Sequence, residues 1–153
     1  SRRRHTRSFH VTGVQTCALP ISFAGFDFDL LATWGGADVQ RLLGDAGIVR
    51  HRGKIEAVIH NAARAIELVA EAGSLAAFVW RFEEPEVADP VLRSTSPQSV
   101  ALAKALKQRG WKFVGPTTMY ALMQAMGLVN DHMDGCTTRS LVQRARKAFK
   151  VPR

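Results

Sequence analysis

Residues 103–124 carry groups that could hold a phosphate. Two apolar stretches with helical spacing flank a connection bounded by glycines, which permit tight turns and close backbone approach because they lack a Cβ. The second stretch begins with proline, and the first amides of a helix are unpaired and attract anions. This layout indicates a helix–hairpin–helix that holds DNA by its backbone, although an ordinary pair of antiparallel helices has the same glycines. The residues expected to contact DNA are Gly110, Lys112, Gly115, Thr117 and Thr118.

A second candidate site consists of His132 and Cys136, which are separated by three residues. On a helix or compact loop this spacing can direct an imidazole and a thiolate at one metal ion. Because a structural zinc site needs four ligands, the pair alone supplies half of one.

Four stretches of the chain resemble bacterial 3-methyladenine DNA glycosylases of the Tag type. They are residues 45–56 (DAGIVRHRGKIE), 78–81 (FVWR), 107–128 (KQRGWKFVGPTTMYALMQAMGL) and 129–136 (VNDHMDGC). Their order and gaps also fit, so the resemblance extends from about residue 23 to about residue 136. It implies a helical glycosylase domain of the helix–hairpin–helix superfamily that excises 3-methyladenine from alkylated double-stranded DNA in base excision repair.

The resemblance also bears on the metal and on catalysis. It implies that His132 and Cys136 supply two of the four ligands of a structural zinc, with the other two in the family's N-terminal segment. The family's pocket glutamate, tyrosine and tryptophans would precede Phe23. We therefore name no catalytic residue and expect this chain to be a truncated fragment with little or no activity. A non-catalytic helix–hairpin–helix module that binds DNA is the alternative.

The two ends of the chain differ from the middle in charge. Residues 1–22 carry four arginines and residues 137–153 carry six basic side chains, and neither segment has an acid. Residues 23–136 have a net charge of −2. The first segment resembles translated sequencing-adapter sequence, so we predict that it is foreign and disordered and exclude Cys17 from any site. The last segment is interpreted as a basic C-terminal tail. Basic ends can attract phosphate, but solvated tails explain them equally simply.

The periodicity of the remaining chain predicts an all-α fold. Helices are expected over residues 38–43 with Asp38 as the N-cap, over 54–72, over 75–82, and over 97–108 with Ser96 as the N-cap. The last is expected over 116–126, with Met119, Leu122, Met123 and Met126 as packing residues. Residues 83–94, which contain two prolines, are expected to form a loop.

The remaining features of the sequence are less specific about function. Residues 50–54 (RHRGK) could line a DNA surface or form a solvated turn, and the sequence favours neither. Asp131 is expected to make hydrogen bonds in a loop rather than to act in catalysis. Two cysteines are too few for a disulfide framework, so a reducing cytoplasm is expected. No apolar run reaches the length of a membrane span, and we expect a monomer.

Overall fold

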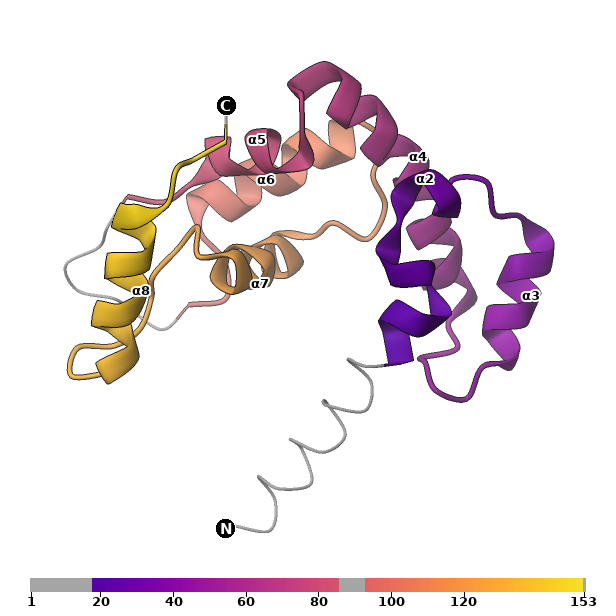
Figure 1. Ribbon diagram of the computed structural model, residues 1–153, viewed down its shortest axis with the longest axis horizontal. Coiled ribbons are helices and arrows are strands. Elements are labelled where there is room, and N and C mark those ends of the chain that lie inside the picture. The colour runs from indigo at the N-terminus through magenta and orange to yellow at the C-terminus, as the bar shows by residue number, and fades with distance from the viewer. Residues whose placement is uncertain (1–17, 86–92, 153) are drawn as a thin grey trace, which may run out of the picture. The chain divides into compact units, whose positions relative to one another are not determined.

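The computed structural model describes residues 18–85 and 93–152, and within these ranges the regular elements are all helices (Figure 1). The predicted all-α fold class is therefore confirmed for this part of the chain. The chain divides into two compact units, and the division falls between Ile66 and Glu67 in the sequence, within one helix. Among the described residues, no helix is both long enough and apolar enough to cross a membrane.

The first unit is built from short helices. Residues 18–22 are helical and are followed by η1 (Ala24–Phe26), α2 (Phe28–Leu31), α3 (Gly36–Gly44) and the first part of α4 (Arg52–Ala72). Asp38 lies in the first turn of α3, where its carboxylate accepts a hydrogen bond from the Gly35 amide at 3.1 Å. The predicted N-cap role of Asp38 is therefore wrong by three positions, because the helix begins at Gly36. The buried core of this unit comprises Phe23, Leu31, Val39, Leu42, Ile48, Ile55 and Ala62.

The structure describes the last five of residues 1–22 and the junction with the rest of the chain. Ser22 is buried, and its hydroxyl donates to a carboxylate oxygen of Asp45 at 2.6 Å. This hydrogen bond is the first cause of a lowered pKa at Asp45. The predicted disorder of residues 1–22 is therefore wrong for residues 18–22, which are helical. Residues 1–17 lie outside the described residues, and for them the predicted disorder, like the foreign origin of the whole segment, stays a prediction.

The second unit contains the end of α4, α5 (Leu75–Val79), η2 (Trp80–Phe82), α6 (Pro97–Gln108), α7 (Pro116–Met126) and α8 (Thr137–Ala148). Ser96 caps α6, where its hydroxyl accepts from the Ser99 amide at 3.1 Å and Pro97 occupies the first turn. The predicted bounds of α6 and α7 are confirmed. The buried core comprises Leu68, Phe78, Trp80, Leu102, Ala103, Leu106, Val114, Met119, Tyr120, Met123, Leu128 and Val129.

Helices α6 and α7 lie side by side in antiparallel orientation and are joined by residues 109–115 (Figure 1). Met119 and Met123 are buried on the side of α7 that packs against the core, and Leu122 is partly buried. Met126 is exposed, so its predicted packing role is wrong. Met119, Met123 and Met126 follow one another along about two turns of α7, but Met126 is the last residue of the helix, next to Gly127, and lies beyond the core.

Helix α8 occupies most of residues 137–153, the segment that the sequence predicts to be a basic tail. It is held to the rest of the second unit by contacts near both of its ends. The Arg139 guanidinium donates to the His132 carbonyl at 2.6 Å, and the Phe149 ring stacks on Trp80 with centroids 4.7 Å apart. Between them, Arg146 donates to a carboxylate oxygen of Glu83 at 2.9 Å and to the Glu84 carbonyl at 2.7 Å. Residues 137–149 are therefore anchored structure, although no residue of α8 itself is buried.

Candidate nucleic-acid interface

The connection between α6 and α7 contains two residues in the left-handed region of backbone space. Gly110 has φ of +79° and follows the last residue of α6 by two positions. Here the predicted need for glycine is confirmed, because side chains with a Cβ rarely adopt this conformation. Phe113 has φ of +58° and is more than half exposed. A non-glycine residue in this conformation is uncommon, and sequence periodicity gave no signal of it.

Gly115 lies at the N-cap of α7 and differs from Gly110. Its φ of −82° is open to any residue, and a Cβ built on it would meet no atom within 4 Å. The turn therefore does not require a glycine here, and the close approach that a missing Cβ permits stays a prediction. What the missing side chain leaves is open space beside the first amides of α7, which matters for the approach of another molecule and not for the fold.

Thr117 and Thr118 are exposed in the first turn of α7, immediately after Pro116. Lys112 is exposed in the connection. The structure thus brings the five predicted DNA-contacting residues into one short segment, with their polar groups at the surface. This geometry can accept a phosphate between the helix amides, the hydroxyls and the lysine.

A hydrogen-bonded network centred on Tyr120 lies further along α7. The Tyr120 hydroxyl donates to a carboxylate oxygen of Asp131 at 2.9 Å and accepts from the Arg93 guanidinium at 3.0 Å. The Gln124 amide donates to the same oxygen of Asp131 at 2.7 Å. Burial raises the pKa of Tyr120. The predicted hydrogen-bonding role of Asp131 is therefore confirmed, and the tyrosine hydroxyl has both a donor and an acceptor in the fold.

Arg93 extends this network to a buried acid, Glu84. Arg93 forms an ion pair with a carboxylate oxygen of Glu84, and its guanidinium lies over the Tyr120 ring, 5.4 Å from the centroid. The Glu84 side chain is 3% exposed, and its other carboxylate oxygen has no hydrogen-bond partner. A buried carboxylate is costly unless it is paired, so Arg93 is the group that makes burial of Glu84 tolerable. The sequence placed both residues in or beside an expected loop and did not indicate their pairing.

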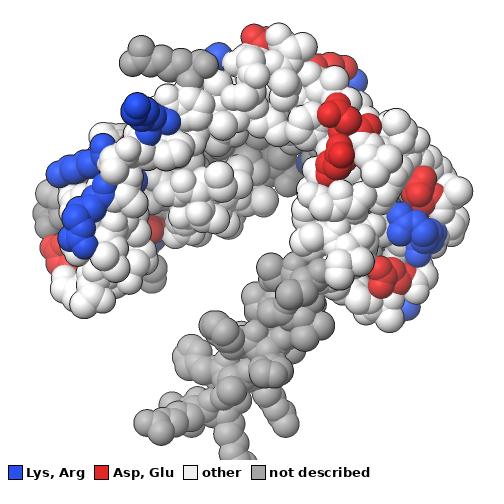
Figure 2. All heavy atoms as spheres, viewed as in Figure 1, with Lys and Arg blue, Asp and Glu red and all other residues white. Residues whose placement is uncertain are grey.

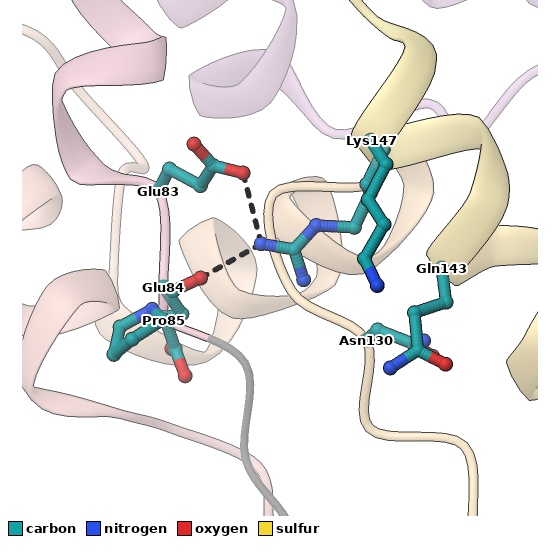
Figure 3. Close-up of a pocket in the computed structure, with 7 residues that line it drawn as sticks. Glu83, Glu84, Pro85, Asn130, Gln143 and Lys147 are labelled. Atoms are coloured by element: carbon teal, nitrogen blue, oxygen red, sulfur yellow. Dashed lines mark hydrogen bonds and ion pairs between the residues drawn. The ribbon is translucent and has the colours of Figure 1, made fainter.

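A polar cleft of about 460 Å³ lies where α8 meets residues 83–85 (Figure 3). Arg146 crosses it to reach Glu83 and the Glu84 carbonyl, and Lys147 and Gln143 lie beside it. An apolar cavity of about 410 Å³ elsewhere in the same unit is lined by Trp80, Trp111 and aliphatic side chains. The cleft has carboxylates without aromatic rings, and the apolar cavity has rings without a carboxylate. Neither offers the combination expected of a base-binding pocket.

The structure brings His132 and Cys136 together, with the imidazole Nδ1 and the Sγ 3.8 Å apart. Two atoms bound to one zinc at about 2.0 and 2.3 Å in a tetrahedral shell lie roughly 3.5 Å apart, so the pair needs little movement to share a metal. The Thr138 amide, by hydrogen bonding, lowers the pKa of the Cys136 thiol. Among the described residues, no group of three or more histidine, cysteine, aspartate or glutamate side chains is arranged to hold a metal. The described residues thus fit half of a zinc site.

The basic residues 50–54 belong to the first unit, at the start of α4. The Arg52 guanidinium lies 3.3 Å from a carboxylate oxygen of Glu56, one turn along the helix. The His51 ring nitrogen accepts from the Lys54 amide at 3.2 Å, as a capping side chain does. These contacts account for two of the side chains as parts of a helix start. Arg50 and Lys54 remain exposed, and the choice between a DNA surface and a solvated turn stays open.

Comparison with known proteins decides the family. The family model described as methyladenine glycosylase matches residues 15–140. The chain belongs to the methyladenine glycosylase family. The family match begins inside the segment that composition sets apart and ends in the first turn of α8. It therefore includes the hairpin, the Tyr120 network and the pair of His132 and Cys136, and it leaves out most of α8.

Methyladenine glycosylases of two bacteria resemble the chain in sequence. It is 47% identical over 120 residues to DNA-3-methyladenine glycosylase 1 of Escherichia coli (strain K12), a match that covers 74% of this chain and 64% of the relative. It is 38% identical over 125 residues to the DNA-3-methyladenine glycosylase of Haemophilus influenzae, covering 78% of this chain and 68% of that protein. The chain therefore spans about two thirds of the length of the curated relatives that it matches.

Solved structures of methyladenine glycosylases share the fold. A crystal structure of 3-methyladenine DNA glycosylase I matches with a TM-score of 0.73 and 43% identity, covering 81% of this chain and 71% of the other. A variant of 3-methyladenine DNA glycosylase I in complex with 3-methyladenine matches with a TM-score of 0.76 and 27% identity, covering 82% and 70%. The helical architecture of the chain is thus that of the family.

Proposed function

We propose that this chain is the DNA-gripping part of a 3-methyladenine DNA glycosylase, an enzyme of base excision repair that hydrolyses the N-glycosidic bond of 3-methyladenine. The observation that carries the proposal is the family match over residues 15–140, which contains the hairpin between α6 and α7. The names of the bacterial relatives supply the substrate, alkylated DNA carrying 3-methyladenine.

In this proposal the hairpin is a helix–hairpin–helix that binds the backbone of duplex DNA. The exposed Lys112, Thr117 and Thr118 and the first amides of α7 hold a phosphate, and the open space at Gly115 lets the phosphate approach. Such contacts position the protein without reading sequence. They hold the duplex while a damaged nucleotide is turned out of the stack.

Cleavage of the N-glycosidic bond of 3-methyladenine needs little general acid catalysis. Methylation at N3 gives adenine a positive charge and makes it a good leaving group. The enzyme then has to select the base by shape and stacking, and to stabilise positive charge on the sugar while water attacks. The carboxylates of Glu84 and Asp131 are engaged in the Tyr120 network, and we assign neither of them a catalytic role.

We further propose that residues 1–153 alone bind DNA but release little or no 3-methyladenine. Neither cavity described above combines aromatic rings with a carboxylate, so a flipped base would gain little to offset its unstacking, which costs a few kcal/mol. Without a carboxylate near the sugar, the rate falls by about 10²–10³. A DNA-binding module without any catalytic role differs from this proposal in one outcome, because extension of the chain would then not produce activity.

The proposed zinc rests on the same family relationship. His132 and Cys136 would supply two ligands of a structural site that stabilises the fold and takes no part in the reaction. Their spacing of 3.8 Å fits this role, and the other two ligands are not among the described residues.

One experiment separates these statements. Binding to a labelled duplex and release of free base from methylated duplex DNA are measured for residues 1–153 and for a chimera. The chimera carries the N-terminal third of the Escherichia coli relative before residue 23. We expect both proteins to bind, and the chimera alone to release 3-methyladenine. Turnover by residues 1–153 would show that the active site lies within this chain, and a folded chimera without turnover would favour the DNA-binding module.

The hairpin is tested with a pair of glycine substitutions. Gly115→Val should leave the fold intact, because the backbone and the space allow a side chain, but it should weaken DNA binding tenfold or more. Gly110→Val is the control for a conformational effect and should cost about 1–3 kcal/mol of stability, since its φ is +79°. A folded G115V protein with unchanged affinity would contradict the hairpin assignment.

A further inference from the structure

The basic side chains of α8 and of the residues after it fall into two sets, one largely buried and one exposed. Arg139 and Arg146 point toward the second unit, and their side chains are only 15% and 14% exposed. Arg144, Lys147 and Lys150 are exposed. Because residues 144 and 147 are three apart, they lie on one side of the helix. We call these three exposed side chains the basic face of α8.

The acids that the structure describes near α8 form their ion pairs with other residues. Asp134 lies 3.4 Å from the Arg139 guanidinium, Glu83 pairs with Arg146, and Glu84 pairs with Arg93. Each neighbouring carboxylate is thus engaged by an arginine other than those of the basic face. Within the described residues, no ion pair involves Arg144, Lys147 or Lys150. Figure 2 shows lysine and arginine side chains gathered over this helix.

The helix that carries the basic face is fixed in place. The Trp80–Phe149 stack, the two hydrogen bonds of Arg146 and the hydrogen bond from Arg139 to the His132 carbonyl hold it along its length. A loose basic tail loses conformational entropy when it binds a ligand, whereas an anchored helix has already lost most of it. The charges are therefore presented in a set arrangement, unlike those of a solvated tail.

We propose that the basic face of α8 is a second contact of this protein with the phosphate backbone of duplex DNA, additional to the hairpin. The inference rests on the proposed function for its choice of polyanion. The family match ends at residue 140, before Arg144, Lys147 and Lys150, so this contact is particular to a part of the chain that the match does not cover. Three exposed cations that form no ion pair with the described acids fit a row of phosphates, which needs no shaped pocket.

The spacing within the second unit agrees with two separate contacts. The hairpin precedes α7 and α8 follows it, so the two regions lie at opposite ends of that helix (Figure 1). Eleven residues of helix span about 16 Å, the distance of about five phosphates along one DNA strand. The basic face therefore contacts phosphates that the hairpin does not occupy.

The salt dependence of DNA binding tests the proposal. The affinity of residues 1–153 for an unmodified duplex is measured at several salt concentrations, for the unaltered chain and for the triple variant R144Q/K147Q/K150Q. The slope of log affinity against log salt is negative, and each lost phosphate contact makes it shallower by about 0.9. We therefore expect the slope of the triple variant to be shallower by about 2.7. Between about 50 and 200 mM salt, the fall in affinity should then be about 40-fold smaller than for the unaltered chain.

Two controls make the result specific. The conservative variant R144K/K147R/K150R keeps the charges and should keep the slope of the unaltered chain. Tryptophan fluorescence, to which Trp80 contributes together with Trp34 and Trp111, should be unchanged in the triple variant, because none of the substituted side chains takes part in the Trp80–Phe149 stack. A slope within 0.5 of the unaltered value, in a triple variant with the stack intact, would overturn the proposal.

The outcome is also distinguishable from failure of the proposed function. If the unaltered chain does not bind duplex DNA, the proposed function fails and the inference with it. If DNA binds and the hairpin variant G115V weakens it while the triple variant does not, only the basic face is refuted. Binding of the unaltered chain to anionic phosphatidylserine vesicles, abolished by the triple variant while the DNA slope is unchanged, would assign the face to a membrane surface and overturn the inference.

Discussion

The pairing of Arg93 with Glu84 gives the sharpest prediction for stability. We expect Arg93→Gln to lower the free energy of unfolding by about 2–3 kcal/mol. Removing one partner of a fully buried pair costs about 3–5 kcal/mol, because the other charge is left uncompensated. The Glu84 side chain is 3% exposed but that of Arg93 is 31% exposed, so solvent screens the pair and the expected loss falls below that range.

The size of the effect depends on the charge that remains. Glu84→Gln removes the buried charge and should cost less than Arg93→Gln, because Arg93 can still donate to the Tyr120 hydroxyl and reach solvent. In the double variant no uncompensated charge is buried. Its loss of stability should therefore be smaller than the sum of the two single losses by about 1–2 kcal/mol.

Urea denaturation of the four proteins measures this cycle, with helical circular dichroism as the signal. An R93Q variant that loses less than about 0.5 kcal/mol would refute the reasoning that burial makes the pair obligatory. Simple additivity of the two losses would show that Arg93 acts on stability through Tyr120 and not through Glu84.

Three further predictions follow from contacts of the second unit. Tyr120→Phe should lower stability by about 1 kcal/mol in thermal denaturation, because the hydroxyl links Arg93 to an acceptor; an unchanged melting temperature would contradict this. The hydrogen bond from Arg109 holds the pKa of Glu71 below its ordinary 4.5. This carboxylate therefore stabilises the fold above pH 4.5, and the stabilisation is lost as the pH falls through the lowered pKa. Between about pH 5 and about pH 3, E71Q should lose less stability than the unaltered chain. Zinc should bind residues 1–153 weakly through His132 and Cys136, and tight stoichiometric zinc in metal analysis would show further ligands within the chain.

Local chemistry made α6 and α7 predictable from sequence. Ser96 and Pro97 mark the start of α6, Gly110 ends the segment, and Pro116 opens α7, and each of these residues acts within a few positions of its neighbours. The side-by-side placement of the proposed phosphate contacts follows from the same local order. The exposure of Met126 shows where periodicity stops being informative, because it identifies a face and not the end of the core that the face meets.

The features that the sequence did not predict depend on distant partners. The network of Glu84, Arg93, Tyr120 and Asp131 joins residues from three parts of the chain, and no pattern in any one part indicates it. Helix α8 has a basic composition that suggests a tail, and its order depends on Trp80 and Glu83, far back in the sequence. The left-handed conformation of Phe113 is a further case, since phenylalanine has no preference for it.

The anchoring of α8 has a consequence for the order in which the second unit folds. The contacts between α6 and α7 form within one short stretch of chain, whereas Arg146 reaches Glu83 across 63 positions. Closing a longer loop costs more entropy, and contacts of low sequence separation form first in most small domains. During synthesis the hairpin can therefore assemble while residues 137–149 are still being added. One face of the Trp80 ring is then exposed to solvent until Phe149 stacks on it. We expect the docking of α8 to be the last step in the folding of the second unit.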